Sequence, residues 1–170
     1  DSAMRGAYRS IGINRNDFCA LIQMRPGKQE DCGTIEWLAF ASNAFNVLAP
    51  FYADVEETPE YLANTTEEVS TDNFYWTSRM IAAMADASYS KSLIHVERCQ
   101  EQVAAKSYER LNGYDALLEK ETDAAARKAL RQEANRAVAD MVKKELAGTL
   151  DKVLYELSGQ MKNAYSRSDA

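Results

Sequence analysis

The C-terminal part of the chain constrains the fold most, because its apolar side chains recur at helical spacing. Most of them are three or four positions apart: Leu130, Ala134, Ala137, Met141, Leu146, Leu150, Val153, Leu157 and Met161. This spacing predicts one long amphipathic helix that opens at Thr122-Asp123 and bends near Gly148. The apolar stripe of such a helix needs another surface to cover it.

Three further helices are predicted upstream of this one. The segment from Asp72 to about Tyr89 is apolar on nearly every side, so it must be packed on several sides. The next helix begins near Ser90 and breaks or bends at Gly113, where glycine costs about 1 kcal/mol relative to alanine. A short helix is expected over 58–63, since a capping hydroxyl, a proline and an acid follow one another at its start.

The first part of the chain has the composition of β-strands. Two apolar runs, Phe18 to Met24 and Thr34 to Phe40, are separated by a polar stretch that contains proline and glycine, and they predict a pair of antiparallel strands. A third strand is predicted from Phe45 to Tyr52. Pro50 lies inside it and favours an edge position or a strand end, because proline cannot donate to a ladder.

Charge and cysteine content exclude several classes of function. The 170 residues carry 20 Lys and Arg against 26 Asp and Glu, a formal charge of −6, without a basic block or a glycine-rich phosphate loop. We therefore expect no binding to nucleic acid. No apolar run approaches the roughly 18 residues of a membrane span, so we expect no membrane association. Three irregularly spaced cysteines predict no disulfide framework and no zinc site, and reduced thiols fit a cytoplasmic protein. No metal and no cofactor are expected.

Seven short segments in the first hundred residues carry a family resemblance when they are taken in order and at their separations. They are Tyr8–Arg15, Ala20–Gln23, Glu36–Phe40, Pro50–Tyr52, Ser70–Trp76, Ala83–Asp86 and Glu97–Gln100. Together they resemble the dipeptidase A family of N-terminal-nucleophile cysteine peptidases. The resemblance covers about the first hundred residues well, and the last seventy share only general helical character with the family.

The resemblance implies a fold and a reaction. Members of the family have two stacked antiparallel sheets between helical layers, and they cleave dipeptides with a cysteine at the mature N-terminus. Here the first residue is Asp1, and the three cysteines, Cys19, Cys32 and Cys99, are internal. We therefore expect the nucleophile to lie upstream of this chain, and the chain to be the C-terminal part of a longer dipeptidase that is inactive alone.

The predicted fold class is α+β, with a single unit over residues 1–170. Residues 1–56 would form antiparallel strands that complete an N-terminal-nucleophile αββα sandwich, and residues 57–170 would form a mainly helical portion that covers them. The missing N-terminal portion of the same protein is then an expected partner, alongside a dipeptide substrate and, through the last helix, a second copy of the chain.

Five polar residues near the strand ends are the candidate site residues. An N-terminal nucleophile can use its own α-amine as the base, so the rest of the site must supply oxyanion donors and groups that hold the charged ends of the substrate. An arginine fork can bind a carboxylate, and an asparagine amide can donate to an oxyanion. The candidates are Arg9, Asn14, Arg15, Asn43 and Asn46. Residues at strand ends also commonly satisfy turns, which is the competing interpretation.

Other polar and aromatic residues have a structural interpretation. Asp72, Arg79 and Asp86 are seven positions apart and would stack on one side of a helix, as a solvated stripe or an ion pair. His95 is predicted to be a surface or helix-packing residue, and Phe74 with its two aromatic neighbours to pack in the core. Two other functions stay open beside dipeptide hydrolysis: a non-catalytic helical self-association domain, and another amidase of the same fold.

Overall fold

The computed structural model describes residues 13 and 16–162, and it has an α+β fold. A three-stranded sheet comes first in the chain and helices follow. The elements are β1 (Phe18–Met24), the 3-10 helix η2 (Glu30–Cys32), β2 (Thr34–Phe40), β3 (Ala49–Tyr52), α1 (Glu60–Ala63), α2 (Phe74–Ala87), α3 (Tyr89–Leu118) and α4 (Ala124–Ser158). The first two strands have the predicted bounds.

The sheet is antiparallel with the order β1-β2-β3. Phe18 lies opposite Phe40 in the first pair, and Trp37 lies opposite Pro50 in the second. β3 is four residues shorter at its start than predicted, because the backbone N–H groups of Phe45 and Asn46 both donate to the carbonyl of Ser42 and fold that segment into a turn. Pro50 sits in an edge strand, as expected.

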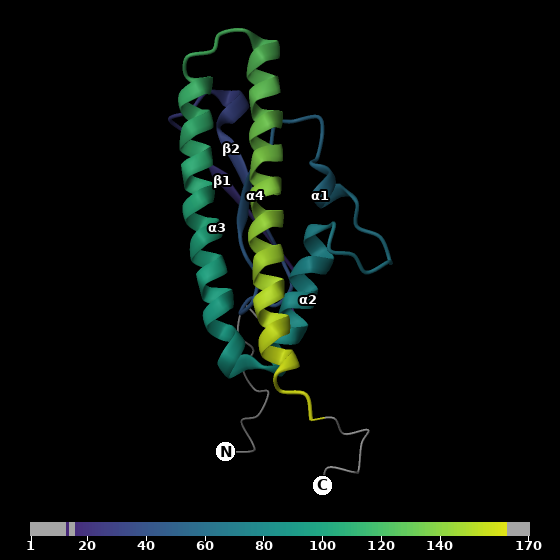
Figure 1. Ribbon diagram of the computed structural model, residues 1–170. Helices are drawn as coiled ribbons and strands as arrows, with labels where there is room; N and C mark the ends of the chain where they lie inside the picture. The colour runs from purple at the N-terminus through teal and green to yellow at the C-terminus, as the bar shows by residue number, and fades with distance from the viewer. Residues whose placement is uncertain (1–12, 14–15, 163–170) are drawn as a thin grey trace, which may run out of the picture.

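Two long antiparallel helices, α3 and α4, lie side by side, and α1 and α2 lie on the other side of α4 (Figure 1). Gly113 does not break α3, and α4 runs without interruption through Gly148. The predicted break at Gly113 is therefore wrong, and α4 is one helix as predicted. A single glycine costs only about 1 kcal/mol, and the packing of the two helices along their length outweighs that cost.

The ends of the shorter helices depend on particular side chains. Asn73 caps α2, and its Oδ1 accepts a hydrogen bond of 2.8 Å from the backbone N–H of Trp76. Asp72 therefore lies before the helix rather than inside it. α1 begins at Glu60 after Pro59, and no side-chain hydrogen bond caps it, so the predicted capping role of the Thr58 hydroxyl is wrong.

The two faces of the sheet are covered by different helices. Alternate residues of a strand face opposite sides, and Trp37 packs with the α3 residue Leu111, whereas Phe40 packs edge to face against the α2 residue Phe74 with ring centroids 5.0 Å apart. α3 therefore covers one face and α2 the other. α4 contributes to both core clusters, through Ala134 on one side and Val142 on the other.

The outer edge of β3 is closed by a side chain of α4. The amide Oδ1 of Asn135 accepts a 2.8 Å hydrogen bond from the backbone N–H of Tyr52, and its Nδ2 donates 3.0 Å to the carbonyl of the same residue. Asn135 is 2% exposed. The side chain thus imitates a neighbouring strand and satisfies both backbone groups of Tyr52 in the protein interior.

β1 forms the other edge of the sheet and is exposed along its whole length. The apolar side chains Phe18, Leu21, Ile22 and Met24 are 56%, 51%, 58% and 79% exposed. By contrast, Ala134, Met141, Leu146 and Val153 of the α4 stripe are buried against the other elements. The exposed apolar side chains are therefore consecutive along β1, whereas on α4, where self-association was expected, those such as Leu154 and Tyr155 lie near the C-terminal end of the helix.

Candidate functional site

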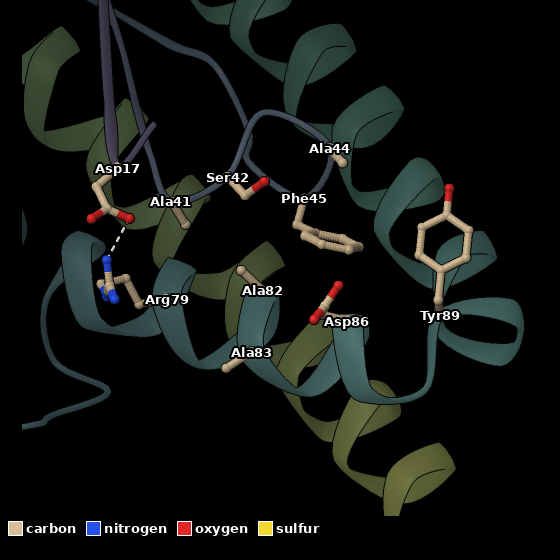
Figure 2. Close-up of a pocket in the computed structure, with 10 residues that line it drawn as sticks. All are labelled: Asp17, Ala41, Ser42, Ala44, Phe45, Arg79, Ala82, Ala83, Asp86 and Tyr89. Atoms are coloured by element: carbon tan, nitrogen blue, oxygen red, sulfur yellow. Dashed lines mark ion pairs between the residues drawn. The ribbon is translucent and has the colours of Figure 1, made fainter. Parts of the chain in front are cut away.

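A surface hollow lies at the end of the sheet where β1 begins and β2 ends, with a volume of about 400 Å³ (Figure 2). Its walls come from the strand ends, the loop after β2, α2 and the start of α3. The lining residues are Asp17, Ala41, Ser42, Ala44, Phe45, Arg79, Ala82, Ala83, Asp86 and Tyr89. This volume falls in the range of small-molecule sites.

The charges in the hollow come from opposite sides of it. Arg79 of α2 forms an ion pair with Asp17, which precedes β1, and its guanidinium also lies 5.6 Å from the centroid of the Tyr75 ring. The Asp86 carboxylate is directed toward the hollow in Figure 2, and among the residues that the structure describes no salt bridge reaches it. Among the described residues, the hollow thus holds one paired cation and one carboxylate without an ion-pair partner.

The predicted stacking of Asp72, Arg79 and Asp86 is only partly correct. Arg79 and Asp86 both line the hollow, two turns apart on α2. Asp72 precedes the helix and forms a 3.0 Å ion pair with Lys143 of α4 instead. The three residues do not form an internal ion pair with one another, and two of them gain a place in a concave site that the sequence spacing did not reveal.

The backbone at Ala41 is unusual. This residue directly follows β2 and has φ of 71°, the left-handed region that residues with a Cβ rarely adopt. Its N–H donates 2.9 Å to the carbonyl of Asp17, and its own carbonyl accepts 3.4 Å from Asn46 Nδ2. These bonds hold the costly conformation, and they place the next residue, Ser42, in the wall of the hollow.

Two of the five candidate site residues can be placed. Asn43 is exposed in the loop after β2, and Asn46 is half-buried in the same loop, where Gln100 Nε2 donates 2.8 Å to its carbonyl. Their neighbours line the hollow, but neither residue does. Arg9, Asn14 and Arg15 lie outside the described residues. Asn46 holds the loop in place, which is the competing structural role.

The residues given a structural interpretation occupy such positions. His95 is half-buried on α3, with Nε2 3.5 Å from Glu156 Oε1 of α4, as expected for helix packing. Phe74 is fully buried. Cys19 is exposed on β1, whereas Cys32 is buried in η2, and all three cysteines are free. Burial raises the pKa of the Cys99 thiol, which makes it a poor nucleophile.

A second polar cluster lies at the opposite end of β1, where the β1–β2 connection meets α3 and α4. Asp115 of α3 accepts 2.7 Å from Arg25 Nη1 and 2.6 Å from the Tyr52 hydroxyl. Burial opposes the charge of Asp115, but the hydrogen bonds from Tyr52 and Arg25 outweigh it and hold the pKa of this carboxyl below its ordinary value. The same burial and hydrogen bond raise the pKa of Tyr52.

Two arginines of α4 extend this cluster. Arg127 and Arg131, one turn apart and nearly buried, donate to the two oxygens of Asp31 at 2.6 Å and 2.5 Å. The hydrogen bond from Arg127 holds the pKa of Asp31 below its ordinary value. Every carboxylate of the cluster is paired, so it ties the strand connection to the helices. Sequence reasoning missed it, although the four-residue spacing of Arg127, Arg131 and Asn135 marks one polar side of the helix.

The described residues contain neither a clustered metal-ligand set nor a helix suited to span a membrane. No group of three or more His, Cys, Asp or Glu side chains in residues 13 and 16–162 lies together in a way that could hold a metal ion. None of the helices α1 to α4 combines the length and apolar character that crossing a membrane requires.

Comparison with known proteins identifies the family. The model of Peptidase family C69 matches residues 1–102. A probable dipeptidase A of Streptococcus pyogenes serotype M3 is 38% identical over 162 residues, which is 95% of this chain and 34% of that protein. A dipeptidase of Bifidobacterium longum is 33% identical over 99% of this chain and 39% of that protein.

The relatives also correct the extent of the resemblance. A probable dipeptidase B of Lactococcus lactis is 28% identical over 97% of this chain. The similarity to these proteins is therefore not confined to the first hundred residues, and it includes α3 and α4. The chain spans about a third of the length of the curated relatives it matches. By the family model and by these relatives, the chain belongs to Peptidase family C69 and is a member of the dipeptidase A family.

Proposed function

We propose that this chain is the C-terminal part of a longer cysteine-type dipeptidase whose nucleophile is a cysteine at the mature N-terminus, outside this chain. The observation that carries the proposal is the family match over residues 1–102, together with relatives named dipeptidase that are about three times as long. The three cysteines of the chain support it, since two are buried and the exposed one lies in a strand rather than at an amino end.

The proposal assigns the strands to one sheet of an N-terminal-nucleophile αββα sandwich. Residues 1–56 would be the β portion and residues 57–170 the helical portion of a single unit. The antiparallel order of the three strands and the helices on both faces of the sheet are compatible with such an arrangement. The remaining strands would come from the longer polypeptide.

The hollow beside α2 is the proposed substrate-binding region. A dipeptide carries an α-ammonium and an α-carboxylate, so its recognition needs an acceptor and a cation. Asp86 would accept from the ammonium, because its carboxylate faces the hollow with no ion-pair partner among the described residues. Arg79 is engaged by Asp17, and this leaves the carboxylate of the substrate to another cation.

Arg9 and Arg15 are the proposed cations for that carboxylate. Arg15 precedes Asp17 by two residues, and Asp17 lines the hollow. Asn14, Asn43 and Asn46 are the proposed donors toward the tetrahedral oxyanion, which would form on the scissile carbonyl when the cysteine attacks it. Asn43 and Asn46 would act from the loop next to the hollow, within a few residues of Ser42 and Phe45.

The proposed setting is the cytoplasm. Three cysteines without a disulfide are typical of a reducing compartment. The proposed partners are the dipeptide and the N-terminal portion of the same protein, without nucleic acid or membrane.

The primary test compares two proteins in the same dipeptide assay. The longer polypeptide should release free amino acids, and alkylation or replacement of its N-terminal cysteine should abolish the release. The 170-residue chain should show no turnover, since groups that position a substrate lower a barrier only when a nucleophile is within reach. Turnover by the purified 170-residue chain would remove the assigned position of the nucleophile.

A second test addresses the hollow in the longer polypeptide. Asp86→Asn should raise KM for dipeptides by about tenfold, which corresponds to the loss of one charge-assisted hydrogen bond of about 1.4 kcal/mol, and it should leave a substrate with a blocked amino group unaffected. Arg9→Ala and Arg15→Ala should raise KM for dipeptides with a free carboxylate. Asp151→Asn, an exposed change on α4, is the matched control with unchanged kinetics.

The alternatives give different outcomes in the same assays. Another amidase of this fold would hydrolyse acyl amides faster than dipeptides. A non-catalytic self-association domain would show no hydrolysis in either protein, and the longer polypeptide would have no processed N-terminal cysteine by N-terminal sequencing.

A further inference from the structure

The hollow beside α2 has a neutral end and an acidic end. At the neutral end Arg79 is paired with Asp17. Asp86 lies two turns further along α2, about 10 Å away at the helical rise per residue, and no salt bridge reaches it within the described part of the chain. The described lining residues therefore include two acids and one base. Their charge is complementary to a ligand with one positive charge.

Two aromatic rings lie at the acidic end. Phe45 is 7% exposed and Tyr89 is 51% exposed, and their ring centroids are 6.0 Å apart in an edge-to-face arrangement. Figure 2 shows both rings toward the Asp86 end of the hollow, away from the pair of Arg79 and Asp17. The other uncharged lining residues among those described are small: Ala41, Ser42, Ala44, Ala82 and Ala83. Their short side chains leave room for an apolar group beside the rings.

The junction between α2 and α3 sets the positions of Asp86 and Tyr89. Ser88 alone separates the two helices and is 4% exposed. Its backbone N–H donates 3.2 Å to the carbonyl of Met84 in α2, and its hydroxyl forms a hydrogen bond with the hydroxyl of Ser92 in α3. These contacts hold the corner between the helices. The backbone of both lining residues is therefore in place before a ligand binds, which lowers the entropic cost of binding.

We propose that the acidic end of the hollow binds the first residue of a dipeptide and selects an apolar side chain on that residue. The α-ammonium would lie at the Asp86 carboxylate, where the face of a neighbouring ring also attracts a cation. The side chain would lie against Phe45 and Tyr89, and its removal from water would stabilise the complex. An acidic first residue is disfavoured, because its carboxylate would be repelled by Asp86.

The inference rests on the proposed function for the identity of the ligand as a dipeptide, and it adds the selectivity for the first side chain. The geometry of the hollow specifies a simpler class of ligand, a primary amine with an apolar body. Phenethylamine belongs to this class and has neither a carboxylate nor an amide bond. Its binding to the 170-residue chain can therefore be measured separately from hydrolysis.

The first experiment titrates the 170-residue chain with phenethylamine and follows binding by NMR chemical shifts. We expect saturable binding, which becomes about fivefold weaker in Asp86→Asn and in Tyr89→Ala, since each variant loses one charge-assisted or aromatic contact. Tyr89→Phe keeps the ring and should keep the affinity. Phenylacetate has the same ring but a negative charge, and it should not bind.

Tyr108→Ala is the matched control. Tyr108 lies on the same helix as Tyr89, is 56% exposed, and also packs against an aromatic ring, that of Trp37, at 5.6 Å between centroids. It does not line the hollow. The control variant therefore loses a comparable contact from α3, and its affinity for phenethylamine should be unchanged.

The second experiment measures selectivity in the longer polypeptide with Phe-Gly and Gly-Gly, which differ only in the first side chain. The ratio of their kcat/KM values should favour Phe-Gly. Tyr89→Ala should lower this ratio about fivefold, whereas Tyr89→Phe and Tyr108→Ala should leave it unchanged. A general loss of folded enzyme lowers both values and leaves the ratio as it was, so the ratio reports on the ring itself.

The outcomes separate this inference from the proposed function. Dipeptide turnover by the longer polypeptide, with a ratio that Tyr89→Ala does not change, would overturn the selectivity and leave the proposed function in place. Absence of phenethylamine binding, or equal binding by the Asp86→Asn variant, would overturn the amine site. Binding that depends on Asp86 and Tyr89, without dipeptide turnover by the longer polypeptide, would support the amine site and remove the proposed function.

Discussion

At one edge of the sheet β3 meets α4, whereas at the other edge β1 pairs with no strand but β2 among the described residues. Asn135 satisfies both backbone groups of Tyr52 at the first edge and is 2% exposed. At the second edge every residue of β1 is exposed. The comparison shows that this chain closes one edge of its sheet with its own helix, whereas the strand at the other edge is exposed.

The largest effect is predicted for one of two phenylalanines, Phe74 and Phe18, that both contact the Phe40 ring. Phe74→Ala should destabilise the chain by about 3 to 5 kcal/mol, because Phe74 is fully buried. Phe18→Ala should cost less than about 1 kcal/mol, because the Phe18 side chain is already 56% exposed. Urea unfolding of both variants gives the two values. Similar losses would mean that β1 is covered in the isolated chain.

The closed edge can be broken by Asn135→Ala. The backbone N–H and C=O of Tyr52 would lose their partners in the interior, at a cost of about 2 to 4 kcal/mol for two buried groups. Gln132→Ala, one turn earlier and half-buried on α4, is the control with a small effect. Chemical denaturation measures both. If the two variants lose equal stability, water can replace the amide and the edge is less closed than proposed.

Acid should weaken the links between the β1–β2 connection and the helices. The pKa values of Asp31 and Asp115 are lowered in the folded chain, so their contribution is present above the ordinary pKa of about 3.9 and is lost as pH falls below it toward the folded values. Asp31→Asn should cost about 1 to 3 kcal/mol at pH 7 and less at pH 3.

The matching control is Asp151→Asn, an exposed change on α4 that should follow the pH dependence of the unmodified chain. Unfolding curves at pH 7, 4 and 3 provide the comparison. An equal cost of Asp31→Asn at every pH would show that the carboxylate charge does not hold this end of β1.

The smallest predicted effect strengthens the helix that closes the β3 edge. Gly148→Ala should stabilise the chain by about 0.5 to 1 kcal/mol, since Gly148 lies inside α4 and an added Cβ meets nothing within 4 Å. In Gly33→Ala the added Cβ would lie 3.2 Å from the carbonyl oxygen of Gln29, so no gain is expected. Thermal unfolding distinguishes the two, and a loss of stability in Gly148→Ala would contradict the prediction.

Local sequence patterns predicted the helices and strands better than they predicted the tertiary contacts of those elements. The strands Phe18–Met24 and Thr34–Phe40 have the expected bounds, and α4 opens at Asp123, at the expected place, because these features depend on neighbouring residues. β3 was overextended because the apolar residues Phe45 and Val47 read as strand, although both are buried core residues of a loop. Packing against elements that are distant in sequence buries this apolar segment without the backbone hydrogen bonds of a sheet.

In the candidate site, too, local sequence patterns predicted part of the arrangement and tertiary contacts decided the rest. The spacing of Arg79 and Asp86 placed both on one side of α2, but the hollow also needs Asp17 and Ser42, which only the folded sheet brings to it. Arg127 and Arg131 were missed because arginine on a helix normally reads as solvent-facing. Both are buried here because Asp31, far away in sequence, pairs with them.

By itself, the sequence determined the family, the α+β order of elements and the apolar periods of the helices, because each depends on residues within one or two turns or on short ordered segments. The tertiary structure decided which surfaces are covered. An apolar pattern indicates that a segment has surface to bury, as both β1 and α4 do, but only tertiary packing decides whether that surface is buried. α4 packs against α2, α3 and β3, whereas among the described residues β1 pairs with β2 alone and stays exposed.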